Sequence, residues 1–216
     1  MRIDVWSDLV CPWCYIGKRR LERALEGFAH HEEVTVVHHA YRLHPDMPVG
    51  STVEKDQMLL RKYRLTPDQL DTMHERLEQT AAEEGLDYDL SGGVTGNTLD
   101  GHRLVAYAAT VGRQDAMVER LFKAYFTERR SIFDRQSLID LAVEAGFDRQ
   151  TVGDVLDAQT FADDVERDQH VASRLGANGV PFFVIGERYG VSGAQPAEVF
   201  ADALRQAWDA THATTV

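Results

Sequence analysis

The sequence contains two cysteines, Cys11 and Cys14, separated by two residues. A pair spaced in this way can form a small disulfide ring and be reduced again, so it can exchange disulfides with a substrate. Because both cysteines lie in one short segment, they cannot cross-link distant parts of the chain. The pair therefore either carries out chemistry or is incidental.

The predicted elements around the pair make Cys11 the reactive thiol. Ile3 and Val5 alternate with polar residues, which predicts a strand leading towards Cys11, and Pro12 suits the first position of a helix. Unpaired backbone N–H groups and the positive end of the helix dipole then point at the Cys11 sulfur. They favour the thiolate, the form that attacks disulfides. Cys14 would lie one helical turn further on, close enough to displace a mixed disulfide.

Two other interpretations of the pair are less favoured. Zinc sites usually have four ligands, and the other candidate ligands here are histidines far away in the sequence, with no second C-x-x-C. A pair of buried structural thiols is the other alternative. A C-x-x-C between a strand and a helix that opens a βαβ unit is more typical of redox chemistry. The sequence therefore predicts a redox pair and no metal site.

A second signal is Gly179-Val180-Pro181, directly before the apolar segment 182–185. Proline cannot donate to a sheet ladder, so it suits the first residue of a strand. The bond before it could be cis, which would leave the Val180 backbone free to pair with an extended peptide. An ordinary trans proline that starts the strand fits the spacing equally well.

The order of the predicted elements indicates an α/β fold with an insertion. Residues 1–45 have strand, helix and strand patterns, and residues 177–216 have two strands and a helix. These two parts can form one four-stranded sheet, which makes one discontinuous domain. Residues 46–176 have helical periodicity almost throughout and are predicted to form a helical insertion domain.

The composition restricts the functional class. The chain has 216 residues, 44% of them hydrophobic, which is enough to bury a core. Its net charge of −12 repels nucleic-acid phosphates and anionic lipids, so we expect neither nucleic acid nor membrane as a partner. No apolar run approaches the roughly 18 residues of a spanning helix. The start of the sequence lacks the long apolar stretch of a secretory signal, so we expect a cytoplasmic protein.

The sequence resembles the FrnE-type branch of the DsbA-like thioredoxin-fold oxidoreductases. The resemblance extends over nearly the whole chain and includes the order and spacing of its motifs. The segments that carry it are Cys11–Lys18 (CPWCYIGK), His102–Leu104, Gly179–Phe183 (GVPFF) and Ser192–Gln195 (SGAQ).

The resemblance implies a thioredoxin fold with a large helical insertion, Cys11 as nucleophile, Cys14 as resolving thiol and a cis bond before Pro181. The chain departs from periplasmic DsbA in lacking an export signal and in having Trp13 where the C-P-H-C motif has histidine. Without that imidazole the Cys11 thiolate loses one stabilising group, so we expect a less oxidising couple. Disulfide reduction or isomerisation is then at least as favoured as net oxidation.

Five residues are candidates for substrate binding. Pro12 and Trp13 lie inside the C-x-x-C motif, where the Trp13 indole would form an apolar rim beside the sulfur. Val180 and Pro181 would supply backbone for an extended substrate. His102 falls early in a predicted helix, where a capping or solvent-facing role competes with a place in the site.

Other titratable residues near the first strand are harder to place. Asp4 or Asp8 could take the proton of Cys14, but the sequence places neither within reach of it. His38 and His39 alternate across a predicted strand, so they cannot bind one metal ion together.

The leading functional prediction is a thiol–disulfide oxidoreductase that acts on disulfide-containing proteins or small thiols, as a monomer or homodimer. It needs no cofactor beyond the Cys11–Cys14 disulfide, with glutathione as a candidate reductant. The alternative is a glutathione-dependent isomerase or transferase, because 2-hydroxychromene-2-carboxylate isomerases and kappa-class glutathione transferases resemble this architecture. Those relatives typically keep Ser or a single Cys at the position of the pair. A third class is a binding or chaperone module that uses the inserted helices as an apolar cleft.

Overall fold

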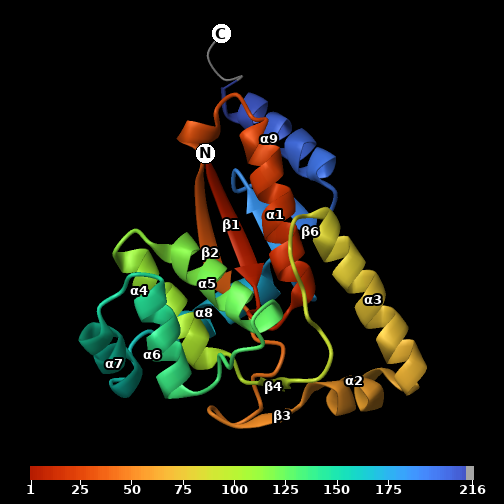
Figure 1. Ribbon diagram of the computed structural model, residues 1–216. Coiled ribbons are helices and arrows are strands. Elements are labelled where there is room, and N and C mark those ends of the chain that lie inside the picture. Colours follow the sequence, from red (N-terminus) through yellow and green to blue (C-terminus); the bar gives the residue numbers. More distant parts are fainter. Residues whose placement is uncertain (213–216) are drawn as a thin grey trace. The chain divides into compact units, whose positions relative to one another are not determined.

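The computed structural model describes residues 1–212 and divides the chain into two compact units (Figure 1). The first, the sheet unit, contains Met1–Tyr41 and the chain from Glu166 on. The second, the helical unit, contains Arg42–Val165. Residues 213–216, which end the predicted range 177–216, lie outside the described part.

A four-stranded mixed sheet forms the centre of the sheet unit. Its order is β2 (Thr35–Ala40), β1 (Arg2–Ser7), β5 (Phe182–Ile185) and β6 (Tyr189–Ser192). β1 and β2 are parallel, whereas β1 with β5 and β5 with β6 are antiparallel. The strands of the predicted βαβ and ββα parts therefore form one sheet, which confirms the expected α/β thioredoxin-like fold with a helical insertion.

Strand alternation gives the sheet two apolar faces. Ile3 and Val5 of β1 join Phe183 and Ile185 of β5 in a core with α1 (Pro12–Glu26) and α9 (Ala197–His212), which pack against each other. The other face carries Trp6, which packs with residues at the end of α8 (Ala162–Arg174) and with alternate residues of β5. A short 3₁₀ turn at His31–Glu33 precedes β2.

The helical unit contains a small two-stranded sheet that the sequence pattern did not predict. β3 (Thr52–Glu54) pairs antiparallel with β4 (Val94–Gly96), and each strand is too short to show a clear period of two. The helices that complete this unit are α2 (Lys55–Tyr63), α3 (Pro67–Glu83), α4 (Leu99–Thr110), α5 (Gln114–Phe126), α6 (Arg135–Glu144), α7 (Arg149–Asp157) and the start of α8. Of the helices described, none is both long and apolar enough to cross a membrane.

The sheet unit resumes earlier in the sequence than the pattern indicates. The sequence places the return at residue 177, but the structure places it at Glu166, within α8. The reason is a set of side-chain contacts to Asp168: Trp6 Nε1 donates to its carbonyl at 3.0 Å, and the Ala40 amide donates to its carboxylate at 2.9 Å. Contacts between residues so far apart leave no local sequence signal.

Gly17 allows α1 to pack closely on the strand β5. A Cβ at this position would lie 3.0 Å from Cγ of Pro181, 3.2 Å from Cζ of Phe183 and 3.4 Å from Cβ of Ala194. All three neighbours are held in the sheet unit, and two of them belong to rings that cannot bend away. The absence of a side chain at Gly17 therefore sets the spacing between the helix and the strand.

We predict that Gly17→Ala lowers the stability of the protein. Overpacking against rigid neighbours costs about 1–3 kcal/mol, which exceeds the roughly 1 kcal/mol that alanine gains over glycine inside a helix. Gly153→Ala in α7 is the matched control, because its Cβ would meet only the end of the flexible Arg135 side chain at 3.4 Å. Thermal and urea unfolding should show a loss for Gly17→Ala and a small gain for Gly153→Ala. An equal gain in both variants would contradict the prediction.

Candidate active site

Cys11 is the N-cap residue of α1, directly after the loop that follows β1. Its backbone is extended (φ −91°, ψ 110°), and Pro12 occupies the first turn of the helix. The Cys11 amide donates to the Asp8 carbonyl at 3.0 Å, and the Cys14 amide donates to the Cys11 carbonyl at 2.9 Å. These bonds hold the C-x-x-C segment at the helix start, which is the place that the sequence predicts.

Both cysteines are free thiols, and both are largely buried. Cys11 is 6% exposed and Cys14 is 2% exposed, so Cys11 is only slightly the more accessible of the two. Burial raises the pKa of Cys14 well above its usual value, and the hydrogen bond and charge of Cys11 raise it further. Cys14 is therefore a protonated thiol near neutral pH, which is the form expected of a resolving thiol.

Val180 lies against the sulfur of Cys11. The Val180–Pro181 bond is cis, which confirms the expectation carried by the resemblance. The Val180 carbonyl oxygen accepts a hydrogen bond from Cys11 Sγ at 3.5 Å. Backbone from the segment before β5 therefore borders the reactive atom directly, although it is far away in the sequence.

Comparisons with known proteins agree with this geometry. The family model described as the DSBA-like thioredoxin domain matches residues 2–205. This chain belongs to that family. It is also similar to the uncharacterized protein YwbO of Bacillus subtilis, with 27% identity over 94% of this chain and 96% of the relative.

Two solved structures extend the comparison of this DSBA-like chain. A probable DsbA oxidoreductase from Streptomyces coelicolor is 43% identical, with a TM-score of 0.94 over 100% of this chain and 92% of that one. A 2-hydroxychromene-2-carboxylate isomerase is 16% identical, with a TM-score of 0.72 over 100% of both chains. The second likeness shows the shared fold alone.

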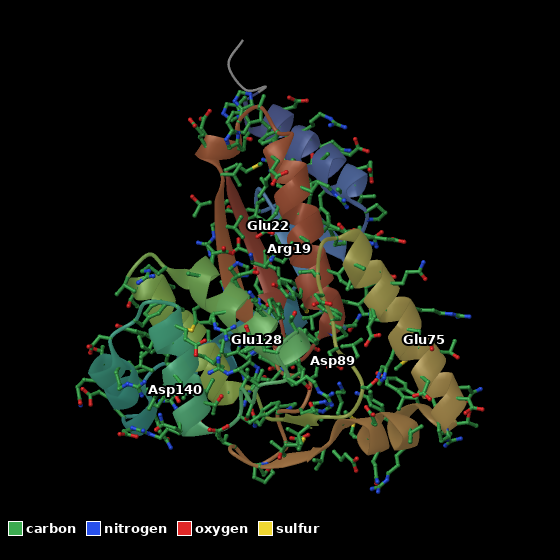
Figure 2. The ribbon with its side chains drawn as sticks, viewed as in Figure 1. Arg19, Glu22, Glu75, Asp89, Glu128 and Asp140 are labelled. Carbon is green, nitrogen blue, oxygen red and sulfur yellow. The ribbon has the colours of Figure 1, made fainter. Side chains whose placement is uncertain are left out.

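Pro12 and Trp13 lie between the two cysteines, in the first turn of α1. Trp13 is 44% exposed, which is unusual for an indole, whereas Pro12 is half-buried. Further along the same helix the side chains are charged: the buried Lys18 and the partly exposed Arg19 both pair with Glu22, and Figure 2 labels Arg19 and Glu22. The exposed apolar surface at the start of α1 is thus next to the dithiol, where the sequence predicts a binding rim.

Of the two carboxylates considered from the sequence, only Asp8 borders the thiols. Asp8 is completely buried; a hydrogen bond from its backbone lowers the pKa of Cys14, and its negative charge raises that pKa by a smaller amount. Asp4 instead accepts hydrogen bonds from Arg2 and contacts His39. Of the two carboxylates, Asp8 is therefore the one that lies near Cys14.

His102 belongs to the helical unit. It lies in the first turn of α4 and is only 3% exposed. Its backbone amide donates to the Thr98 carbonyl at 3.0 Å, as part of the helix start. A role for His102 in substrate binding remains a prediction.

The sequence pattern missed a second polar group in the sheet unit. His39 contacts the carboxylates of both Asp4 and Asp168. Strand alternation could have placed Asp4 and His39 on the same face of two parallel neighbours. No sequence signal points to Asp168, because the whole insertion separates it from His39 in the sequence.

We predict that Cys14 reacts slowly in the folded protein. In a Cys11→Ser variant, iodoacetamide should modify Cys14 slowly throughout the neutral range and faster only at alkaline pH, because burial keeps its thiol protonated. The same variant unfolded in urea should react quickly at the same pH, and Cys14→Ser provides the comparison for Cys11. Rapid modification of native Cys14 at neutral pH would contradict the assignment of roles.

Proposed function

We propose that this protein is a thiol–disulfide oxidoreductase in which Cys11 is the nucleophile and Cys14 the resolving thiol. One observation carries the proposal: Cys11 Sγ lies at the N-cap of α1, 3.5 Å from the Val180 carbonyl. The helix start favours negative charge on the sulfur. The neighbouring backbone offers a hydrogen-bonding edge for an extended peptide that carries a disulfide.

The first step forms a mixed disulfide. The Cys11 thiolate attacks one sulfur of the substrate disulfide and forms a bond to it, while the substrate's own sulfur–sulfur bond breaks. The departing sulfur leaves as a thiolate and takes a proton from solvent. The exposed indole of Trp13 supplies apolar surface beside the reacting atoms.

The second step releases the substrate. Cys14 loses its proton and attacks Cys11 Sγ, so the Cys11–Cys14 disulfide forms and the remaining substrate thiolate departs. The pKa of Cys14 is raised by burial, so this step needs a base. The buried carboxylate of Asp8 is the group beside Cys14 that can take the proton. The two steps together oxidise the dithiol and reduce one substrate disulfide, and their reversal oxidises a substrate dithiol.

The direction of exchange depends on the potential of the couple against its surroundings. Trp13 stands where periplasmic DsbA has histidine, so the proposed couple is less oxidising than that of DsbA. In the cytoplasmic location that the sequence predicts, this difference favours reduction or isomerisation. Equilibration of the Cys11–Cys14 couple with glutathione buffers measures the potential. Membership of the FrnE-type branch remains a prediction.

We predict different losses for the two cysteine variants. Cys11→Ser should lower insulin reduction by dithiothreitol to the uncatalysed rate, because the remaining thiol, Cys14, is buried and protonated and does not readily form the mixed disulfide. Cys14→Ser should accumulate a covalent complex with the substrate, visible by mass spectrometry and removed by a reductant. Circular dichroism would verify that both variants fold. Full turnover by Cys11→Ser would overturn the proposed mechanism.

A glutathione-dependent isomerase is the competing function. The isomerase structure reported above has the same fold, so the fold does not separate the two activities. The presence of the second thiol, Cys14, distinguishes the two activities. In a dithiol enzyme an adduct on Cys11 is expelled by a neighbour at an effective concentration of roughly millimolar or above, whereas bound glutathione that supplies its own thiolate needs no Cys14.

We predict that glutathione reacts with the oxidised protein without binding it tightly. With reduced glutathione, the oxidised wild type should show only a fleeting adduct on Cys11, because Cys14 displaces it. Cys14→Ser has no disulfide of its own, so oxidised glutathione is used there, and its adduct on Cys11 should be stable. Mass spectrometry detects the adduct, and calorimetry measures reversible binding. Micromolar non-covalent binding in both proteins, with turnover that survives Cys14→Ser, would instead support the isomerase class.

A further inference from the structure

His39 of β2 lies between two carboxylates. Its Nδ1 is 2.8 Å from Oδ1 of Asp168 in α8, and its Nε2 is 2.6 Å from Oδ1 of Asp4 in β1. The imidazole side chain is only 17% exposed. Both ring nitrogens of this histidine therefore face an acceptor that carries no proton of its own when ionised.

This arrangement fits the charged form of the ring. An imidazolium has an N–H on each nitrogen, whereas a neutral imidazole has one N–H and one lone pair. If His39 were neutral, the lone pair would face a carboxylate oxygen at hydrogen-bond distance. Burial disfavours the charged ring, but the hydrogen bonds and charges of Asp168 and Asp4 outweigh it and raise the pKa of His39.

His39 and its partners attach α8 to the sheet. The second oxygen of Asp168 accepts the amide of Ala40 at 2.9 Å, and its carbonyl accepts Trp6 Nε1 at 3.0 Å. Asp4 is in turn held by Arg2 Nε at 2.9 Å. His39 is the member that joins the two carboxylates. Loss of its proton leaves one ring nitrogen without an N–H, which breaks the bridge from Asp168 of α8 through His39 to Asp4 of β1.

The same group supports the segment beside the reactive sulfur. The Trp6 indole stacks on His39, with ring centroids 4.5 Å apart and an interplanar angle of 17°. Trp6 also packs in one apolar cluster with Val180 and with residues at the end of α8. Val180 is the residue whose carbonyl meets Cys11 Sγ. His39 therefore contacts a member of the apolar cluster against which Val180 packs, and Val180 in turn contacts Cys11.

We propose that His39 is a positioning residue for the dithiol: as an imidazolium it fixes α8 and Trp6, and through them the Val180 carbonyl beside Cys11. Loss of the proton loosens this support, so that Cys11 reacts more slowly than it does when His39 is an imidazolium. This inference rests on the proposed function only in naming disulfide exchange as the reaction affected. The reactivity of Cys11 itself is the property that His39 controls.

The charged groups around the ring determine the sign of the effect. Asp4 of β1 and Asp168 of α8 face it directly, with Arg2 behind Asp4. β5 consists of apolar residues, and His38 alternates to the other face of β2. Because the pKa of His39 is raised, its stabilising contribution is complete below the ordinary histidine range and is lost as the pH rises through the raised value.

Within residues 1–212, no three His, Cys, Asp or Glu side chains form a metal site.

The test compares pH profiles of the full-length protein. The rates of insulin reduction and of Cys11 modification by iodoacetamide are measured from mildly acidic to alkaline pH in the wild type, His39→Gln and Asp168→Asn. His170→Gln is the matched control, because His170 is exposed on the same helix. Nitrogen-detected NMR of the wild type shows how many ring nitrogens of His39 carry a proton at each pH.

We expect the wild type to react severalfold faster than His39→Gln at the acidic end, with the ratio approaching one as His39 loses its proton. In Asp168→Asn the midpoint of this pH dependence should move to lower pH, since one of the two negative charges is gone. A merely structural contact would not move that midpoint. His170→Gln should follow the wild type throughout.

Parallel profiles for the wild type and His39→Gln would overturn the proposal, and so would a His39 ring with a single N–H at acidic pH. If His39→Gln does not fold, two measurements still test the proposal: the midpoint of the rate profile in Asp168→Asn against that of the wild type, and the NMR titration of the His39 ring. Absence of insulin reduction at every pH would reject the proposed function, but the iodoacetamide profiles would still test His39, because that reaction requires no disulfide substrate.

Discussion

Antiparallel pairing of β1 with β5 is the constraint on which the site depends. Ile3 lies opposite Ile185, and Trp6 lies opposite Phe182, so the end of β1 meets the beginning of β5. Cys11 follows the end of β1, and Val180 precedes the beginning of β5. Any register that buries the alternating apolar residues of both strands therefore brings these two segments to the same end of the sheet. The hydrogen bond between Cys11 Sγ and the Val180 carbonyl follows from this pairing.

The two thiols differ because they occupy different positions at the start of α1. Cys11 is the N-cap, where backbone N–H groups lack helical partners, whereas Cys14 is inside the first turn, where the backbone of the buried Asp8 hydrogen-bonds to it. Burial keeps the proton on Cys14 and so keeps it from competing as a nucleophile. The same burial makes its later deprotonation depend on a neighbouring base. In the proposed mechanism, this difference between the two thiols makes Cys11 react first and Cys14 second.

The sequence predicted the parts of this site that depend on local pattern. The strand before Cys11, the helix that starts at Pro12 and the strand after Pro181 each have a clear period or a proline at a diagnostic position. Side-chain partners across long separations could not be predicted. The choice between Asp4 and Asp8 as the carboxylate beside Cys14 depended on how the loop after β1 folds back, which alternation does not encode.

The return of the chain at Glu166 also escaped prediction, because α8 has one helical period across the boundary between the two units. The part of α8 from Glu166 on belongs to the sheet unit because Asp168 forms hydrogen bonds with Trp6 of β1 and with His39 and Ala40 of β2.

The bond between Ala40 and Asp168 also explains how the sheet unit accommodates a large insertion. Ala40 is the last residue of β2, just before the helical unit begins, and Asp168 follows closely after the chain returns. The two ends of the insertion are thus joined by a hydrogen bond within the sheet unit, and the Tyr41 amide is held by the Ser7 carbonyl at 3.0 Å. An insertion whose ends are adjacent in space leaves the host sheet unstrained. His39 contacts the same Asp168 carboxylate, so the junction that closes the insertion includes the ring that stacks on Trp6.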